Sequence, residues 1–353
     1  MTISNTGLVD PIERKLVKKK KDRIMIAWVA YQRRVESLSR YCDLNVYYIH
    51  YKWEEKSKLY KPLSYIFKMV QTAITLFRTN AKVVFIQLPP TFPLYILVFY
   101  CWLKKAAYIC DCHNTTFYDG PWIKFPFAKK MLRNSAVVLV HNEDIEEKVK
   151  DWGFPDMLLR DPIPQMSVNE NIQTVGGIKI KQDKYVIFPG SFGTDEPLDE
   201  LFDAMRLCPN VLFACTWFSE KLSKEQQKTL PANLRLTGFL NEETFTALYA
   251  NAAAAIVLTT REGTQPSGAA EAVSLCVPLI ISDIATTRRL YSEAGVFVKS
   301  TSNSIAEGVN YALSNQDKLR MQVRRLKEKL GSENNDQLTR FQERLKQLED
   351  NLN

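Results

Sequence analysis

The chain has 353 residues and a formal net charge of +8, and it is 46% hydrophobic and 24% charged. This composition is typical of a globular protein and excludes a disordered or collagen-like chain. The length is sufficient for two domains of ordinary size, each with its own buried core.

The excess of basic charge is greatest near the N-terminus, where seven Lys and Arg residues stand between Arg14 and Arg23. Such a run is either a solvated arm or a segment attracted to anionic lipid headgroups. We expect no nucleic-acid partner, because the sequence has no helix-turn-helix, RRM-like or zinc-finger pattern. The N-terminus also lacks the apolar core of a signal peptide. Seven scattered cysteines without metal-site spacing favour reduced thiols in a cytoplasmic protein.

Short apolar runs alternate with helical patterns along the first half of the chain, which predicts βαβ units and a parallel sheet. The expected strands are Ile24–Ala30, Asn45–Ile49, Val83–Gln87, Ala107–Asp111 and Ala136–Val140. The expected helices are Arg33–Arg40, Pro62–Thr79, Pro93–Lys105, Trp122–Arg133 and Glu143–Asp151.

The alternation resumes in the second half. The expected strands are Tyr185–Pro189, Val211–Thr216, Leu234–Thr237, Ala254–Leu258, Leu279–Ser282 and Val296–Val298. The expected helices are Pro197–Leu207, Lys224–Thr229, Glu242–Asn251, Gly268–Leu275, Ser304–Leu313 and a charged terminal helix from Gln316 to Leu348. That last helix either packs back across the domain junction or binds a partner.

These patterns predict an α/β protein with two lobes, each built on a parallel sheet. The expected divisions are a basic arm (1–23), an N-terminal lobe (24–162), a linker (163–184), a C-terminal lobe (185–315) and a helical segment (316–353). Two such lobes usually bind their ligand in the cleft between the carboxyl ends of the two sheets.

The segment Arg261–Asp283 is the most informative stretch of the chain. A loop with Glu262, Gly263 and Gly268 leads into a small-residue helix that carries Glu271. Such a loop lets backbone N–H groups approach a phosphate, and the helix N-terminus adds the positive end of its dipole. The segment resembles the donor-binding loop of glycosyltransferases with the GT-B fold, in which two Rossmann-like lobes face a central cleft.

Four further segments follow predicted strands, beginning at Gln87 (Gln-Leu-Pro-Pro), Asp111 (Asp-Cys-His-Asn), Arg160 (Arg-Asp-Pro-Ile-Pro) and Gly190 (Gly-Ser-Phe-Gly-Thr-Asp-Glu). In this order they resemble the chitobiosyldiphosphodolichol β-mannosyltransferase family and its bacterial group 1 and group 4-like relatives. The resemblance covers roughly residues 83–283 and implies a metal-independent hexosyltransferase. Its co-substrate would be a UDP- or GDP-linked sugar and its acceptor a lipid-linked saccharide or related glycan, with no further cofactor and no metal.

The chain departs from the larger retaining GT-B families in two places. Ser191 and Glu196 stand where those families carry an Arg and a Lys that neutralise the diphosphate. Eight residues separate Glu262 from Glu271, whereas seven separate the acids of those families.

The resemblance implies a donor site formed by Gly190, Ser191, Glu262, Gly263, Thr264, Ser267, Gly268 and Glu271. Glu271 is placed to accept hydrogen bonds from ribose hydroxyls, or else it is a helix acid stabilised by the dipole. Glu262 either holds hydroxyls of the donor sugar or pairs with Arg261. The glycines either let a phosphate approach the backbone or simply form tight turns.

His113 is the candidate general base, because histidine suits proton transfer at neutral pH. Asp111 either orients His113 or acts as the base itself. The alternative for His113 is a structural role in capping the turn at residues 114–116. We read His50 and His141 as structural or peripheral. Arg33 and Arg34 are candidates for contact with an acidic lipid-diphosphate acceptor. Arg288 or Arg289 either supplies a counter-charge to the diphosphate or is a solvated helix arginine.

The predicted helix Pro62–Thr79 carries many apolar residues, with Lys61, Lys68 and Arg78 at its edges. The pattern fits an interfacial helix on a membrane with a lipid-linked acceptor, and it equally fits packing against the first sheet. Peripheral membrane contact is therefore a candidate property. Two other functions stay open, namely a catalytically silent GT-B scaffold and, less favoured, a sugar-nucleotide epimerase.

Overall fold

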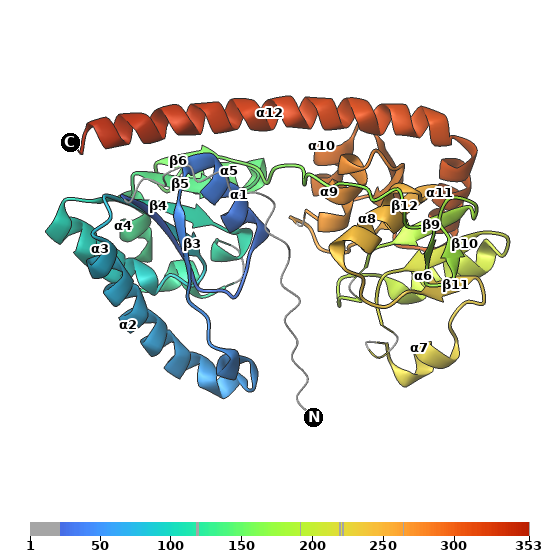
Figure 1. Ribbon diagram of the computed structural model, residues 1–353, viewed down its shortest axis with the longest axis horizontal. Coiled ribbons are helices and arrows are strands. Elements are labelled where there is room, and N and C mark those ends of the chain that lie inside the picture. Colours follow the sequence, from blue (N-terminus) through green and yellow to red (C-terminus); the bar gives the residue numbers. More distant parts are fainter. Residues whose placement is uncertain are drawn as a thin grey trace. The chain divides into compact units, whose positions relative to one another are not determined.

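The computed structural model describes residues 22–117, 120–190, 192–218, 220, 222–263 and 265–352 (Figure 1). The chain forms two compact units, and the first contains the residues before Pro162 together with those from Asp336 onward. The second unit is Pro162–Asn335. Residues 1–21 of the expected basic arm lie outside the described residues, as do Ser191 and Thr264 of the expected donor site.

The first unit is built on a six-stranded parallel sheet with the order β2-β1-β3-β4-β5-β6. Its strands are β1 (Arg23–Ala27), β2 (Asn45–Tyr48), β3 (Val83–Leu88), β4 (Ala107–Cys112), β5 (Val137–Val140) and β6 (Asp156–Leu158). Almost every residue of β1, β3, β4 and β5 is buried, as expected for a parallel sheet covered on both faces.

Helices cover both faces of this sheet. They are α1 (Arg33–Cys42), α2 (Lys61–Thr79), α3 (Pro93–Lys104), α4 (Ala128–Arg133) and α5 (Glu143–Lys150), with short 3-10 helices η1 (Lys52–Glu55) and η2 (Lys58–Tyr60) before α2 and η3 (Asn114–Thr116) and η4 (Trp122–Lys124) before α4. One core joins the sheet to α2, α3, α4 and α5, and the other joins it to α1 and the end of the terminal helix.

The second unit repeats the design with a six-stranded parallel sheet in the order β11-β10-β9-β12-β13-β14. Its strands are β9 (Tyr185–Phe188), β10 (Leu212–Cys215), β11 (Leu234–Leu236), β12 (Ala254–Val257), β13 (Leu279–Ser282) and β14 (Gly295–Val298). This is the 3-2-1-4-5-6 order of the dinucleotide-binding sheet, with its change of direction between β9 and β12.

The helices of the second unit again form two layers. They are α6 (Leu198–Leu207), α7 (Lys224–Lys228), α8 (Glu242–Ala250), α9 (Ser267–Ser274), α10 (Ala285–Tyr291) and α11 (Ser302–Ser314). One core packs α8, α9 and α10 on the sheet, and the other packs α6 and α11 on it. Helix α10 was not predicted from the sequence.

The terminal helix α12 (Gln316–Asp350) belongs to both units. Its first turns bury Leu319, Val323 and Leu326 in the cores of the second unit. Its last turns bury Phe341 and Leu345 in the first unit, where the Phe341 ring meets that of Phe85 edge-on at 6.0 Å. The structure therefore favours the packing alternative for this helix.

The division at Asp161 lies one residue before the expected end of the first lobe. The expected linker, residues 163–184, belongs to the second unit and contains an antiparallel pair, β7 (Thr174–Val175) and β8 (Ile178–Lys179). Val175, Ile178 and Ile180 are buried in the core of that unit. All seven cysteines are free thiols. Among the described residues, no helix is both long and apolar enough to cross a membrane.

Candidate active site

Two loops of the second unit meet where its sheet changes direction. One follows β9 and contains Gly190, and the other follows β12 and contains Glu262 and Gly263. The hydroxyl of Thr259 donates to Asp195 Oδ2 over 2.7 Å, and Thr260 N donates to the Asp195 carbonyl over 2.7 Å. These bonds tie the two expected donor loops together at the point where α/β sheets of this order bind ligands.

The start of α9 lies against the end of β9 because Gly268 has no side chain. A Cβ at Gly268 would stand 2.9 Å from Pro189 Cγ and 3.3 Å from Val257 Cγ2. The Tyr249 hydroxyl donates to the Gly268 carbonyl over 2.6 Å and fixes the first turn of the helix. Among the described residues no side chain caps the N-terminus of α9, where the helix dipole has its positive end.

Glu271 lies one turn into α9 and is 8% exposed. A carboxylate with this little exposure needs polar partners. Burial raises the pKa of the neighbouring Tyr249 phenol, and the negative charge of Glu271 raises it further. Glu271 is therefore not a solvated surface acid, and both roles considered for it, contact with ribose hydroxyls and a helix acid stabilised by the dipole, stay open.

Glu262 is exposed and holds the start of α10 rather than pairing with Arg261. Its Oε1 accepts from Ala285 N over 3.3 Å and its Oε2 from the Thr286 hydroxyl over 3.5 Å. Gly263 N donates to the same Thr286 hydroxyl over 3.0 Å. The φ of Gly263 is 72°, in the left-handed region that favours glycine, so the loop needs this residue for its turn.

The remaining described donor-site candidates differ in exposure. Gly190 is buried, and a Cβ there would meet the Phe188 ring at 2.1 Å. Ser267 is exposed at the first residue of α9. Glu196 accepts a hydrogen bond from Gly193 N over 3.0 Å, so it closes the β9 loop locally.

A second cluster of polar side chains lies at the carboxyl ends of the strands in the first unit. Arg34 Nε donates to Asp111 Oδ1 over 2.8 Å, and Arg34 Nη1 donates to Asp161 Oδ1 over 2.7 Å. The Arg34 side chain is 3% exposed. The expectation that Arg34 meets an acceptor phosphate is therefore wrong for this arrangement, because two carboxylates already neutralise the guanidinium. Arg33, by contrast, is exposed at the first residue of α1.

Asp111 does not orient His113 directly. Its Oδ1 also lies 3.3 Å from His141 Nε2, and Oδ2 is buried without a partner. Burial opposes ionisation of this carboxyl, but Arg34 and His141 outweigh it and hold the pKa of Asp111 well below its usual range. A carboxylate this weakly basic is a poor general base. The predicted role of Asp111 as base or as direct partner of His113 is corrected accordingly.

His113 is partly exposed and faces two amides. Its Nε2 lies 2.7 Å from Gln32 Nε2 and 2.8 Å from Gln87 Nε2. His113 is also the N-cap residue of η3, where its carbonyl accepts from Thr116 N over 2.8 Å while its side chain makes no capping bond, so the turn-capping alternative stays open for its backbone. Burial and the neighbouring His141 lower the pKa of His113 to about 4, so the imidazole is neutral at neutral pH. The tautomer of the ring decides which group donates in each of these two contacts.

His141, which we read from the sequence as structural or peripheral, belongs to this cluster. It is buried, and its ring centroid lies 4.5 Å from that of His113. The next residue, Asn142, caps α5 by accepting from Ile145 N over 2.9 Å. Its Nδ2 also donates to Asn114 Oδ1 over 3.2 Å, so the loops after β4 and β5 are joined.

Asp111, His113 and His141 are also the candidate metal ligands among the described residues, because their ligand atoms all lie within 4.8 Å of one another. The arrangement does not suit a divalent cation well. The Arg34 guanidinium already bonds Asp111 Oδ1, so an added cation would meet a like charge. The Nε2 of His113 is occupied by the two glutamine amides.

The sequence of the second unit matches a known family, and the fold matches solved structures over nearly the whole chain. Residues 175–329, less than half of the chain, match the family model of Glycosyl transferases group 1. The structure of Anabaena HepE, solved in complex with UDP and glucose, has a TM-score of 0.65 at 11% identity, covering 93% of this chain and 92% of that one. The chain has the GT-B fold.

Two other GT-B-like structures are similar. A glycosyltransferase from Rickettsia africae has a TM-score of 0.66 at 10% identity, covering 93% of this chain and 99% of that one. A putative UDP-N-acetylglucosamine 2-epimerase from Listeria monocytogenes has a TM-score of 0.58 at 11% identity, with coverages of 86% and 91%. No curated protein sequence matches the chain. The sequence match and the fold together support a glycosyltransferase.

Sequence reasoning missed three residues that the GT-B fold brings into the two clusters. His141 follows β5, where polar residues gather at the end of a parallel strand, and Asp161 lies inside the quoted segment after β6 but was not singled out. Asp195 lies inside the quoted segment after β9 but was not singled out. Each of these residues follows a strand, which was a usable signal. The sequence did not identify their partners, Arg34 for Asp161 and Thr259 for Asp195.

Proposed function

We propose that the protein is a glycosyltransferase that transfers a hexose from a nucleotide diphosphate sugar to a lipid-linked saccharide or related glycan. The observation that carries the proposal is the loop before α9, fixed against β9 by Gly268 within the segment that matches Glycosyl transferases group 1. Similar structures contain UDP or UDP-glucose, which supports a nucleotide-sugar donor.

The proposal assigns donor binding to the second unit. Backbone N–H groups of the loops after β9 and β12, together with the uncapped N-terminus of α9, bind the diphosphate. The Glu271 carboxylate accepts hydrogen bonds from the ribose hydroxyls. Glu262 holds the donor loop on α10, and Ser267 supplies a hydroxyl at its end. Ser191 and Thr264, which lie outside the described residues, stay predicted donor-site residues. The fixed amides stabilise the departing diphosphate without the aid of a metal ion.

The proposal assigns the acceptor to the first unit, with His113 as general base. A neutral imidazole is ready to accept a proton, but its Nε2 faces Gln32 and Gln87. The acceptor hydroxyl therefore replaces one of these amides before the proton moves. Asp111 and Arg34 act as positioning residues through His141, and Arg33, exposed at the first residue of α1, contacts an acidic acceptor.

The experiment is a screen of donor hydrolysis and transfer with UDP- and GDP-linked sugars. We expect turnover with one nucleotide and retention of activity in EDTA. His113→Ala should lower kcat by about 100-fold or more, the usual contribution of a general base. GDP-mannose as the preferred donor would support the mannosyltransferase relationship, and a UDP-sugar would point to other GT-B enzymes.

The catalytically silent alternative is favoured by the absence of an Arg/Lys pair after β9, where Glu196 instead closes the loop. Thermal shift measurements with UDP, GDP and their sugars separate the two functions. A scaffold should show no stabilisation by any of them, whereas the proposed enzyme should be stabilised by at least one.

A further inference from the structure

Helix α2 presents most of its large apolar side chains outward. The residues buried at helical spacing are Ser64, Lys68, Thr72 and Leu76, and Tyr65 and Met69 pack against the core beside them. The exposed apolar residues are Leu63, Ile66, Phe67, Val70, Ile74 and Phe77, each between 43% and 60% exposed. Lys61, Gln71 and Arg78 are exposed as well. A helix on the surface of a globular protein normally has the reverse arrangement, with its apolar stripe toward the core.

The inward contacts fix this orientation. Lys68 Nζ donates to Glu54 Oε1 over 2.7 Å and to the Trp28 carbonyl over 3.3 Å. Trp28 Nε1 donates to the Thr72 hydroxyl over 3.0 Å. Rotating α2 to bury its apolar residues would break these bonds and leave Glu54 without its ammonium partner, so the outward apolar side is a property of the folded unit.

Helix α3 extends the same apolar surface. It packs beside α2 (Figure 1), and the rings of Phe77 and Tyr100 meet edge-on at 5.5 Å across the two helices. Phe99, Trp102 and Leu103 of α3 are 51–75% exposed. We call the exposed apolar residues of α2 and α3 the α2–α3 face. Contiguous exposed apolar surfaces of this kind mark interaction sites.

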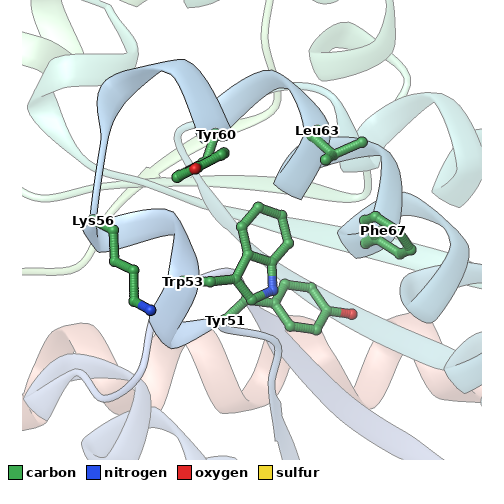
Figure 2. A pocket seen from close by; sticks show the side chains of 6 residues that line it. All are labelled: Tyr51, Trp53, Lys56, Tyr60, Leu63 and Phe67. Carbon is green, nitrogen blue, oxygen red and sulfur yellow. The ribbon is translucent and has the colours of Figure 1, made fainter.

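An aromatic pocket adjoins this face at the start of α2. Figure 2 shows its lining residues, which are Tyr51, Trp53, Lys56, Tyr60, Leu63 and Phe67. The cavity has a volume of about 540 Å³, and Lys56 is its one charged lining residue. Trp53 stacks on Tyr51 at 5.6 Å and meets Phe67 edge-on at 6.1 Å. Leu63 and Phe67 belong to both the pocket and the α2–α3 face, so the two are continuous.

The charge around this surface is predominantly basic, and the one exposed acid beside the pocket-lining Lys56 among the described residues is Glu55, whose side chain is 68% exposed. Residues 56–110 contain eight Lys and Arg residues and no Asp or Glu. Six of the eight are exposed, namely Lys56, Lys61, Arg78, Lys82, Lys104 and Lys105. A protein partner would normally have to supply a matching acidic rim, whereas the headgroups of an anionic bilayer offer negative charge over the whole area.

We propose that the α2–α3 face docks on an anionic lipid bilayer, with the aromatic pocket receiving an apolar chain from it. The exposed side chains enter the boundary between headgroups and acyl chains while the basic residues contact the headgroups. Tyr60 and Trp53 suit that boundary because each combines an apolar ring with a polar end. This property does not depend on glycosyl transfer, so its test is separate from the test of the proposed function.

The test is flotation of the full chain with vesicles of phosphatidylcholine alone and of phosphatidylcholine with phosphatidylglycerol. We expect binding to the anionic vesicles only. The double variant Lys61→Glu/Arg78→Glu should reduce binding by at least about 25-fold, from roughly fivefold for each lost charge. Ile66→Ser/Val70→Ser should reduce it by about tenfold or more, because two side chains no longer enter the bilayer.

Matched controls lie on the second unit. Lys228→Glu/Arg235→Glu reverses two charges there, and Phe239→Ser removes an apolar side chain that is 69% exposed. Both controls should bind vesicles as the unchanged protein does. A far-UV spectrum and an unfolding curve for each variant establish that the first unit is folded. Equal losses in the control and test variants would overturn the proposal.

Fluorescence gives an independent measurement of the pocket and face. Lipids that carry a quencher on the acyl chain should quench the tryptophan emission of the protein. Trp53→Phe and Trp102→Phe should each reduce that quenching, whereas Trp217→Phe in the second unit should not. No quenching in bound protein would contradict insertion. A dimer in solution that Ile66→Ser/Val70→Ser converts to monomer would assign the face to a second copy of the chain and also overturn the proposal.

Discussion

Arg34 Nε donates to Asp111 Oδ1 over 2.8 Å, and both side chains are almost completely buried. Arg34 comes from the start of α1 and Asp111 from β4, so the pair joins a helix to the carboxyl edge of the sheet. Asp161, the last residue before the second unit, adds a second carboxylate to the same guanidinium. The candidate acceptor site therefore rests on a buried charge cluster.

Replacing Arg34 by methionine should strongly destabilise the first unit. The change leaves the Asp111 carboxylate buried without its cation, which typically costs about 3–5 kcal/mol. Urea unfolding measures the loss. Lys181→Met is the matched control, because its pair with Glu170 is exposed and should contribute about 1 kcal/mol or less. The double variant Arg34→Met/Asp111→Leu should recover part of the loss, and a double variant less stable than Arg34→Met would contradict this explanation.

His113 should make the free energy of unfolding fall on acidification. Its pKa is lowered from 6.5 to about 4 in the folded protein, so between these values the unfolded chain binds a proton that the folded chain does not. Stability is therefore complete above pH 6.5 and decreases as the pH falls toward 4. Unfolding curves across this range should show a flatter profile for His113→Asn. Identical profiles for the two proteins would show that His113 does not titrate in this way.

Gly268→Ala should distort the donor loop. The added methyl group would meet Pro189 Cγ at 2.9 Å, and such overpacking costs about 1–3 kcal/mol. Gly331→Ala is the control, because a Cβ there meets nothing within 4 Å and removal of a helical glycine should stabilise by about 0.5–1 kcal/mol. Calorimetric unfolding compares the two, and a neutral Gly268→Ala would show that the close contact with β9 is not required.

Glu262 should act on donor binding through the position of its loop. Glu262→Ala removes the acceptors for Ala285 N and the Thr286 hydroxyl and should cost about 1 kcal/mol, like the loss of a helix cap. Glu262→Gln keeps one carbonyl oxygen and should restore most of the stability and donor affinity. Failure of glutamine to restore affinity while stability returns would instead indicate direct contact of the carboxylate with the donor sugar.

Much of the fold follows from the sequence because the buried strands are mostly apolar, with polar residues such as Gln87, Asp111 and Ser282 only near their carboxyl ends. The strands β3, β4, β9 and β13 were predicted within one residue at each end. Helix α10 was missed because its seven residues, Ala285–Tyr291, contain too few turns to show a period. The pair β7–β8 was taken for a linker because each strand has only two residues and the turn between them is Gly176-Gly177.

The sequence indicated where the candidate site residues stand along the chain, but not which of them contact one another. The rule that polar residues gather after strands located Asp111, His113 and Gly190. It did not reveal that Arg34 lies against Asp111, because the two are 77 residues apart and only the folded sheet brings them together. For α2, the pattern of apolar residues fitted both packing against the sheet and an interfacial position. The buried hydrogen bonds of Lys68 and Thr72 fix which side of the helix faces outward.

The central claim is that the second unit binds a nucleotide sugar through Glu271. The most direct measurement is calorimetric titration of UDP- and GDP-sugars into the unchanged protein, Glu271→Ala and the exposed-acid control Glu200→Ala. We expect one nucleotide sugar to bind the unchanged protein and the control equally, and Glu271→Ala to bind it about tenfold or more weakly, from the loss of charge-assisted hydrogen bonds. Equal binding by Glu271→Ala, or no binding of any nucleotide sugar to the unchanged protein, would contradict the account.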